Sequence, residues 1–432
     1  MPAITLSASQ LQQNPSNKII LFGDSRIQNE YGVTSSTIIN YNRGPINIAN
    51  SLLDKRLGVI ANKGIGGDTT SLLLARYDTD IKIYSGLCKY IYLMVDINDV
   101  YATTDLATIL SNLNTLYDYM ERDNFHIIDT AGYYPAAALS VTEQRKFQKI
   151  SDFKKRQAAV RKNLRVIDCH RVLGDYLTST TPSNLFFDTT LHINVRGAWL
   201  IAKELVNIFS NVPFTDKLIT SQLNVRTNTD NTISSNINSN PMMVGTTGAH
   251  HATGFTINDP SPTGGFVAGV TTGYTTRRNS GTGTGHLSVG VNSKIVGQVQ
   301  RFKIVTENTA GATYQFAPTS AITSRVNKGV NYIARGKVVI TNPVRLHTVM
   351  LRIVYTENGT VKSVRDMSDT SPNLNGYIPE SCTLTLETPI LNIPTASSLT
   401  NFEVQVLLIF DSNAGEGSVI VDIGQLSVEE VG

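Results

Sequence analysis

Short apolar runs alternate with amphipathic stretches through the first half of the chain. The runs are almost continuously hydrophobic, as expected for strands buried on both faces of a parallel sheet. Five such strands are predicted, over residues 18–22, 57–61, 90–95, 126–130 and 164–168. Apolar residues also recur at helical spacing over residues 104–120, 143–163 and 196–209. This alternation predicts a doubly wound α/β domain over residues 18–212, preceded by an N-terminal segment of residues 1–17.

The second half of the chain has a different pattern. Residues 213–239 are rich in Asn, Ser and Thr, which predicts a linker. From residue 240 to residue 432, apolar and polar residues alternate between Gly, Asn and Pro, without a helical period. Six segments there have the pattern of antiparallel strands: residues 298–306, 330–341, 345–356, 381–387, 402–410 and 418–426. The pattern predicts a β-sandwich of jelly-roll type with roughly eight strands.

Length, charge and cysteine content limit the number of domains and the kinds of binding partner that are expected. At 432 residues the chain is too long for a single core, and two or three domains are expected. The formal net charge is only +3, and basic and acidic residues are interspersed, which argues against nucleic acid or an anionic membrane as the main partner. The three cysteines, Cys88, Cys169 and Cys382, lack the spacing of a zinc site or a disulfide framework.

Neither a signal peptide nor a membrane span is visible in the sequence. Residues 1–18 are polar and lack an apolar region after a basic one, and no apolar run is long enough to cross a bilayer. We therefore expect a protein that stays in the cytoplasm or leaves the cell by another route, such as lysis.

A serine follows the first predicted strand, in the sequence Phe22-Gly23-Asp24-Ser25. A doubly wound sheet binds its ligands beyond the carboxyl ends of its strands, so the hydroxyl would lie at the functional edge. Gly23 permits a tight turn there, and Ser25 would be exposed for nucleophilic attack. In isolation, the same tripeptide is more often a turn or a helix cap than a nucleophile.

Polar loops follow the next two strands as well. The glycine-rich residues 62–70 could present backbone N–H groups to a developing oxyanion. The same loop could instead cap a helix over residues 69–77, with Asp68 as the N-cap. Residues 95–99 place the amide of Asn98 at the same sheet edge, where an asparagine is also a common turn former.

A histidine precedes the final predicted helix, in the segment of residues 187–194 that contains Asp188 and His192. Histidine suits general-base catalysis because its ordinary pKa lies near neutrality. A neighbouring carboxylate can fix its tautomer and stabilise the imidazolium. This segment is therefore a candidate source of both the base and its orienting acid.

The order of these features resembles the GDSL or SGNH hydrolase family, whose four blocks supply Ser, Gly, Asn and His in turn. The matching residues are 23–25, 62–70, 96–99 and 188–194, within a resemblance that spans about residues 18–209. It implies a flavodoxin-like five-stranded sheet, with Ser25 as the nucleophile, His192 as its base and Asp188 as the orienting acid. It also implies an oxyanion hole formed by the Ser25 N–H, the Gly67 N–H and the Asn98 side chain. No metal or organic cofactor is implied.

Two positions depart from the family's pattern. The third block normally begins with Gly, whereas this chain has Asp96. A carboxylate facing the site would raise the pKa of His192 or disfavour anionic substrates. The last block is normally Asp-x-x-His, but three residues separate Asp188 from His192, and Thr189 stands at the usual acid position. Either the loop bulges so that Asp188 still reaches the imidazole, or a backbone carbonyl orients the ring.

Two other histidine-containing pairs are weaker candidates. Cys169 and His170 are neighbours on an extended chain, so their side chains point in opposite directions. His250 and His251 lack a convincing set of further ligands, which favours a solvated loop over a metal site.

The biological expectation combines these features. Residues 240–248 resemble the entry into jelly-roll modules that follow SGNH domains in bacteriophage tail proteins. We therefore expect an O-acetyl esterase of a phage tail spike or fibre, acting on acetylated capsule or O-antigen polysaccharide. Its β module would bind glycan or support a homotrimer, and its other partners would be virion tail proteins, with neither nucleic acid nor a membrane involved. The alternatives are a lipase or thioesterase of the same family, and a non-catalytic receptor-binding protein.

Overall fold

The chain forms two compact units. The computed structural model describes residues 17–32, 38–133, 135, 139–174, 181, 183–186, 191–213, 217–218, 236–250, 255–256, 265–307, 311–319, 322–368, 376–412 and 415–431. The first unit consists of Met1–Tyr31, Gly44–Ile46 and Arg56–Thr215. The second consists of Gly32–Arg43, Asn47–Lys55 and Asp216–Gly432, and is called the β unit below.

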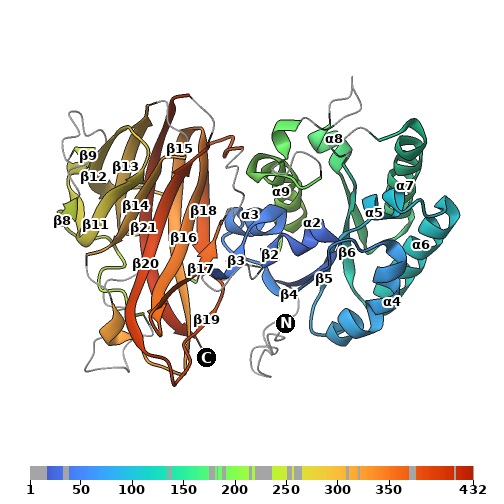
Figure 1. Cartoon of the computed structure of the whole chain (residues 1–432), viewed down its shortest axis with the longest axis horizontal. Coiled ribbons are helices and arrows are strands. Elements are labelled where there is room, and N and C mark those ends of the chain that lie inside the picture. The colour runs from blue at the N-terminus through green and yellow to red at the C-terminus, as the bar shows by residue number, and fades with distance from the viewer. Residues whose placement is uncertain are drawn as a thin grey trace. The chain divides into compact units, whose positions relative to one another are not determined.

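A parallel five-stranded sheet forms the centre of the first unit, in the order β4-β1-β5-β6-β7 (Figure 1). Its strands are β1 (Lys18–Gly23), β4 (Gly58–Gly64), β5 (Tyr90–Met94), β6 (His126–Ala131) and β7 (Leu164–Asp168). Every residue of β1 is buried, which explains its unbroken apolar sequence. The strand order is that of flavodoxin-like sheets, so the predicted doubly wound fold is confirmed.

Helices cover both faces of this sheet. Figure 1 shows α4 (Thr70–Asp80), α6 (Leu106–Arg122) and α7 (Val141–Val160) on one side and α9 (Val195–Phe209) on the other. The apolar stripe predicted for residues 104–120 is the buried face of α6. The shorter helices of the chain are α2 (Ser25–Gln28), α3 (Gly44–Leu52), α5 (Ile97–Tyr101) and α8 (Cys169–Leu173), with 3-10 turns at Lys82–Tyr84, Ser183–Leu185 and Thr323–Arg325. Among the helices of the described residues, none is both long and apolar enough to cross a membrane.

Two eight-stranded sheets make up the β unit. In the first, the order is β10-β12-β13-β21-β15-β18, with β9 on β12 and β19 on β15. In the second, it is β2-β3-β17-β16-β20-β14-β11-β8. The strands are β2 (Tyr31–Gly32), β3 (Ile38–Asn42), β8 (Thr247–His250), β9 (Phe255–Thr256), β10 (Val267–Ala268), β11 (Val270–Ser280), β12 (Thr284–Val291), β13 (Gln298–Thr306), β14 (Thr313–Pro318), β15 (Asn331–Val344), β16 (Leu346–Glu357), β17 (Thr360–Asp366), β18 (Cys382–Glu387), β19 (Leu391–Asn392), β20 (Leu399–Phe410) and β21 (Gly417–Val431). The predicted sandwich is confirmed, but the expected number of roughly eight strands is too low.

Aromatic pairs join the two sheets of the β unit. Phe302 of β13 packs against Phe316 of β14, with ring centroids 5.7 Å apart. Tyr332 of β15 packs against Phe402 of β20 at 5.5 Å. Edge-on ring contacts of this kind stabilise a core beyond the area that they bury. These four side chains therefore mark the inner faces of the sandwich.

A segment from the early part of the chain belongs to the β unit. Strand β3 runs parallel to β17, with Tyr41 opposite Arg365. Near the end of the same segment, Lys55 forms a buried ion pair with Asp366 at 2.9 Å. Nothing in the hydrophobic pattern predicts that this early segment belongs to the β unit.

The end of the predicted linker is also integrated into the β unit. Asn236 and Asn238 are fully buried. Asn238 donates to the hydroxyl of Tyr274 at 2.7 Å, and its backbone neighbour Ile237 donates to Val428. Residues 214–216 and 219–235, and the predicted N-terminal segment up to residue 16, lie outside the described residues.

Candidate active site

Ser25 lies on a tight turn at the carboxyl end of β1. The N–H of Asp24 donates to the carbonyl of Met94 on β5 at 3.2 Å, and the Asp24 carboxylate caps α2 by accepting from the Arg26 N–H at 2.9 Å. A Cβ atom on Gly23 would lie 2.2 Å from the Met94 oxygen, so only glycine allows β1 and β5 to approach this closely. Ser25 consequently begins α2 at the edge where the sheet was predicted to carry its site.

His192 meets Ser25 at this edge. Its Nε2 lies 2.9 Å from the Ser25 Oγ, although 167 positions separate the two residues in the sequence. Both residues are partly exposed. The contact has the geometry of a nucleophile hydrogen-bonded to its general base.

The loop that carries His192 is held on both sides. The hydroxyl of Tyr133 donates to the carbonyl of Leu191 at 2.9 Å. On the other side, Ile193 forms a β-bridge with Phe186, and the side chain of Asn194 caps α9. These contacts fix the backbone on either side of His192.

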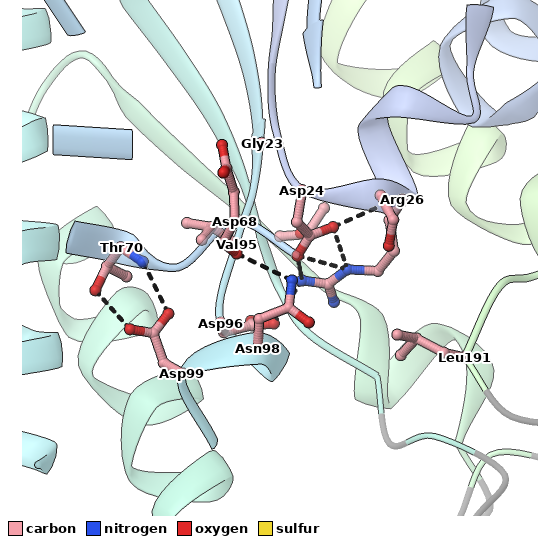
Figure 2. Close-up of polar contacts among 12 residues, drawn as sticks. Gly23, Asp24, Arg26, Asp68, Thr70, Val95, Asp96, Asn98, Asp99 and Leu191 are labelled. Carbon is pink, nitrogen blue, oxygen red and sulfur yellow. Dashed lines mark hydrogen bonds and ion pairs between the residues drawn. The ribbon is translucent and has the colours of Figure 1, made fainter. Parts of the chain in front are cut away.

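The predicted oxyanion donors come from neighbouring turns. Gly67 lies in the turn after β4 with a φ of +85°, a conformation that favours glycine. Asn98, in the first turn of α5, donates to the Asp68 carbonyl at 3.0 Å and has a second amide N–H (Figure 2). Within the described part of the chain, the backbone N–H groups of Ser25 and Gly67 donate to no protein acceptor. The hydrogen bond from Asn98 to Asp68 therefore joins the second and third blocks, and a Cβ atom on Gly66 of the second block would lie 3.8 Å from the Ser25 Cβ.

The predicted helix-capping role of Asp68 is wrong. The helix α4 begins one residue later than expected, and its N-cap is Thr69, whose Oγ1 accepts from the Leu72 N–H at 3.4 Å. Asp68 instead accepts from Arg76 at 2.8 Å. Burial raises the pKa of the Asp68 carboxyl in spite of this arginine.

Arg76 is a structural member of the site that the sequence analysis missed. Its Nη2 donates to the carbonyl of Gly23 at 3.1 Å and to that of Lys63 at 2.8 Å. Its guanidinium also lies 4.6 Å from the ring centroid of Phe22. Arg76 thus ties the ends of β1 and β4 to the turn that carries Gly67. The available signal was its helical spacing of four from Asp80, with which it also pairs.

A buried charge network lies beside the Ser25 turn. Arg26 donates from Nη2 to Asp24 at 2.7 Å and to Asp96 at 2.8 Å, and Figure 2 shows the guanidinium of Arg26 between these carboxylates. From α7, the Nζ of Lys154 lies 3.2 Å from Asp96 and 3.2 Å from Asp129. All five side chains are almost fully buried.

Asp96 therefore does not place its carboxylate in the substrate site, which was the possibility that its departure from the family pattern raised. Its carboxylate is fully buried and engages two cations instead of facing a substrate. Burial alone would raise the pKa of Asp96, but Lys154 and Arg26 outweigh it and lower the pKa. The carboxylate fits because its neighbour is Gly132, where a Cβ atom would lie 2.7 Å from Asp96 Oδ2.

The remaining candidates are settled only in part. Asp188 and Thr189 lie outside the described residues, so the choice between a bulged loop and a carbonyl partner stays open. Cys169 is fully buried, and burial raises the pKa of its thiol, which disfavours a nucleophilic role. His250 ends strand β8, whereas His251 lies outside the described residues. Within the part of the chain that the structure describes, no group of three or more His, Cys, Asp or Glu side chains is placed to hold a metal ion.

A protein family model and several solved structures are each similar to part of the chain. The model of the GDSL-like Lipase/Acylhydrolase family matches residues 21–200. An acetylxylan esterase from Geobacillus stearothermophilus is similar in structure, with 21% identity and a TM-score of 0.37, over 46% of this chain and 95% of that one. An α/β hydrolase from the metagenome of Lake Arreo has 21% identity and a TM-score of 0.37, over 46% of this chain and 97% of that one. No curated protein matches the sequence.

The family match and the site geometry concern the same residues. The matched range begins within β1 and ends within α9, so it contains all four blocks, including the paired Ser25 and His192. Residues 21–200 of this chain are thus similar to the GDSL-like Lipase/Acylhydrolase family.

Proposed function

We propose that the chain is a serine esterase that removes O-acetyl groups from a bacterial surface polysaccharide. The observation that carries the esterase part is the 2.9 Å contact between His192 Nε2 and Ser25 Oγ. A serine hydroxyl is a weak nucleophile until a neighbouring base accepts its proton. We infer that the N–H groups of Ser25 and Gly67 and the amide of Asn98 supply the stabilisation that a tetrahedral oxyanion requires.

The reaction proceeds in two steps. Ser25 Oγ attacks the ester carbonyl while His192 takes the hydroxyl proton, and the N–H groups of Ser25 and Gly67 and the amide of Asn98 stabilise the oxyanion. His192 then returns the proton to the departing sugar oxygen, which leaves an acyl-serine. Water activated by His192 hydrolyses this acyl group and regenerates the enzyme.

The biological setting forms part of the proposal. We infer a phage tail spike or fibre, because residues 240–248 resemble the entry into jelly-roll modules of tail proteins. A homotrimer bound to other tail proteins is the assembly that this role implies. Light scattering of the purified chain tests the trimer, and a monomer at micromolar concentration would contradict it.

Hydrolysis of p-nitrophenyl acetate tests the catalytic assignment. Ser25→Ala should reduce turnover by at least about 10³-fold. Ser111→Ala is the matched control, because Ser111 is an exposed serine on α6, and it should retain wild-type turnover. A Ser25→Ala enzyme as active as the Ser111→Ala control would refute the assignment.

Acetate release from purified capsule or lipopolysaccharide tests the substrate class. The proposal predicts acetate release by the wild type and none by Ser25→Ala. Rapid cleavage of butyrate and longer esters, with no acetate from any glycan, would favour the lipase or thioesterase alternative. Glycan binding without hydrolysis of any ester would favour the non-catalytic receptor-binding alternative.

A further inference from the structure

Three arginines lie on neighbouring strands of the second sheet of the β unit. Arg277 of β11 stands opposite Gln315 of β14. Arg352 of β16 stands opposite Gln405 of β20 on one side and Arg365 of β17 on the other. Directly opposed residues share a face of a sheet. These five side chains are called the arginine row below.

The arginine row faces away from the core of the sandwich. Gln315 stands opposite Leu407, which is two positions from Gln405, so both halves of the row lie on one face. The next residue after Gln315 is Phe316, which points to the opposite face and packs against Phe302 of the other sheet. The row therefore lies on the outer face of its sheet.

Buried amides hold the guanidinium groups in place. The Oε1 of Gln315 accepts from Arg277 Nε at 3.0 Å, and the Oε1 of Gln405 accepts from Arg352 Nε at 2.8 Å. The two glutamines are only 3% and 4% exposed. The third arginine donates from Nε to Ser363 at 2.9 Å. Among the described residues no group accepts from the Nη atoms of these arginines.

The arginine row carries positive charge that is not paired with any carboxylate of the part of the chain that the structure describes. Several other arginines of the β unit form ion pairs, such as Arg301 with Asp422 at 2.7 Å and Arg335 with Glu387 at 2.7 Å. Within the described residues, no carboxylate lies within ion-pair distance of an arginine of the row. The nearest acid contact is that of Glu403, which accepts from the amide of Gln405 at 2.7 Å.

The electrostatic environment of the arginine row is unfavourable without an anion. Burial lowers the pKa of Arg352 to about 10, and the neighbouring charges of Arg365 and Arg277 act in the same direction, whereas Glu403 opposes them. Burial also lowers the pKa of Arg365. An anion between these side chains would relieve the repulsion and replace lost hydration.

We propose that the arginine row binds the carboxylate groups of an acidic polysaccharide. Guanidinium forks match carboxylates in a bidentate geometry. The row crosses five adjacent strands, from β11 to β17, which corresponds to about 19 Å at the usual strand spacing. That length suits carboxylates repeated along a sugar chain better than a single small anion. This site goes beyond the proposed esterase reaction and does not depend on it.

Binding of polygalacturonate to the full chain tests the proposal, with neutral dextran as the comparison polymer. We expect the wild type to bind polygalacturonate and not dextran, with an affinity that falls as salt is added. Arg352→Gln and Arg277→Gln should each weaken binding roughly tenfold, because each removes charge-assisted hydrogen bonds. Lys303→Gln is the matched control, since Lys303 is an exposed cation on β13 of the other sheet and its substitution removes the same charge.

The choice of variants separates a loss of polymer binding from a failure to fold. Arg277 is exposed, so Arg277→Gln should fold even if the substitution at the half-buried Arg352 lowers the melting temperature. The proposal would be overturned if the variants of the arginine row bound polygalacturonate as tightly as Lys303→Gln does. It would also be overturned if double-stranded DNA bound more tightly than polygalacturonate and lost that affinity in the same variants. Ser25→Ala should bind the polymer normally, so a failure of the esterase proposal leaves this result unaffected.

Discussion

Arg26 donates from Nη2 to the carboxylate of Asp96 at 2.8 Å, and this contact joins the residue after Ser25 to the strand end that precedes Asn98. Because both side chains are buried, breaking the pair leaves one charge without its partner. We predict that Arg26→Met destabilises the first unit by about 3–5 kcal/mol. Asp96→Asn, which keeps the shape of the side chain, should cost less.

Double-mutant measurements test the coupling of this pair. The combined variant Arg26→Met/Asp96→Asn should lose less stability than the sum of the two single variants, with an interaction energy of about 0.5–3 kcal/mol. The fall in activity of Asp96→Asn should appear in kcat more than in KM, because the pair positions the nucleophile and does not contact the substrate. Additive losses of stability, or a change confined to KM, would contradict this account.

The pH dependence of stability should also report on Asp96. Its pKa in the folded protein is lowered below 3.8, so its ionised form contributes stability that is present above pH 3.8 and lost as the pH falls through the folded value. Asp129 acts in the opposite direction, because burial raises its pKa. The difference in unfolding free energy between the wild type and Asp96→Asn isolates the first group. It should be constant near neutrality and shrink below about pH 4, and a difference that grows on acidification would contradict the assignment.

Arg76→Met should weaken catalysis through the oxyanion turn. The variant loses the hydrogen bonds to Gly23, Lys63 and Asp68, so the turn that carries Gly67 is no longer tied to the ends of the strands. We expect a loss of about tenfold in kcat, smaller than the roughly 10²–10³-fold loss expected for Asn98→Ala.

A second arginine provides the control for this prediction. Arg122→Met removes a guanidinium that lies at the same 4.6 Å from an aromatic ring, that of Tyr119, at the end of α6. Its side chain is 50% exposed, and its loss should leave kcat unchanged. Equal kcat values for the Arg76 and Arg122 variants would rule out the positioning role.

Asp188→Asn distinguishes the two possible partners of His192. If Asp188 orients the imidazole, kcat should fall by roughly 10³–10⁴-fold. Thr189→Ala is the matched control, because Thr189 occupies the acid position of the usual spacing, and it should have little effect. A loss of less than about tenfold in Asp188→Asn would show that a backbone carbonyl orients the ring.

Local sequence patterns predicted the first unit well because its strands are buried on both faces. The strand over residues 164–168 matches β7 (Leu164–Asp168) at both ends. The strand ends then brought Ser25 and His192 together as expected from the fold. By contrast, β3 depends on a partner strand more than 300 positions away, in which Arg365 stands opposite Tyr41, and no local period reports such a pairing.

The role of Asp96 could not be predicted from local sequence patterns either. The sequence displays the carboxylate but not the cations that neutralise it. Lys154 reaches Asp96 across 58 positions from α7, and Gly132, which leaves room for the carboxylate, lies after β6. The chemistry of a buried ionic group is set by neighbours from other elements. The sequence therefore reveals this departure from the family pattern but not the cations that surround the carboxylate.

Covalent trapping of the nucleophile tests the central claim most directly. The wild type and His192→Ala are treated with a fluorophosphonate, which reacts with activated serines, and the modified residue is located by peptide mass spectrometry. The account predicts one adduct, on Ser25, formed at least about 10²-fold more slowly in His192→Ala. An unmodified wild-type protein, or an adduct on another residue with Ser25 intact, would contradict it.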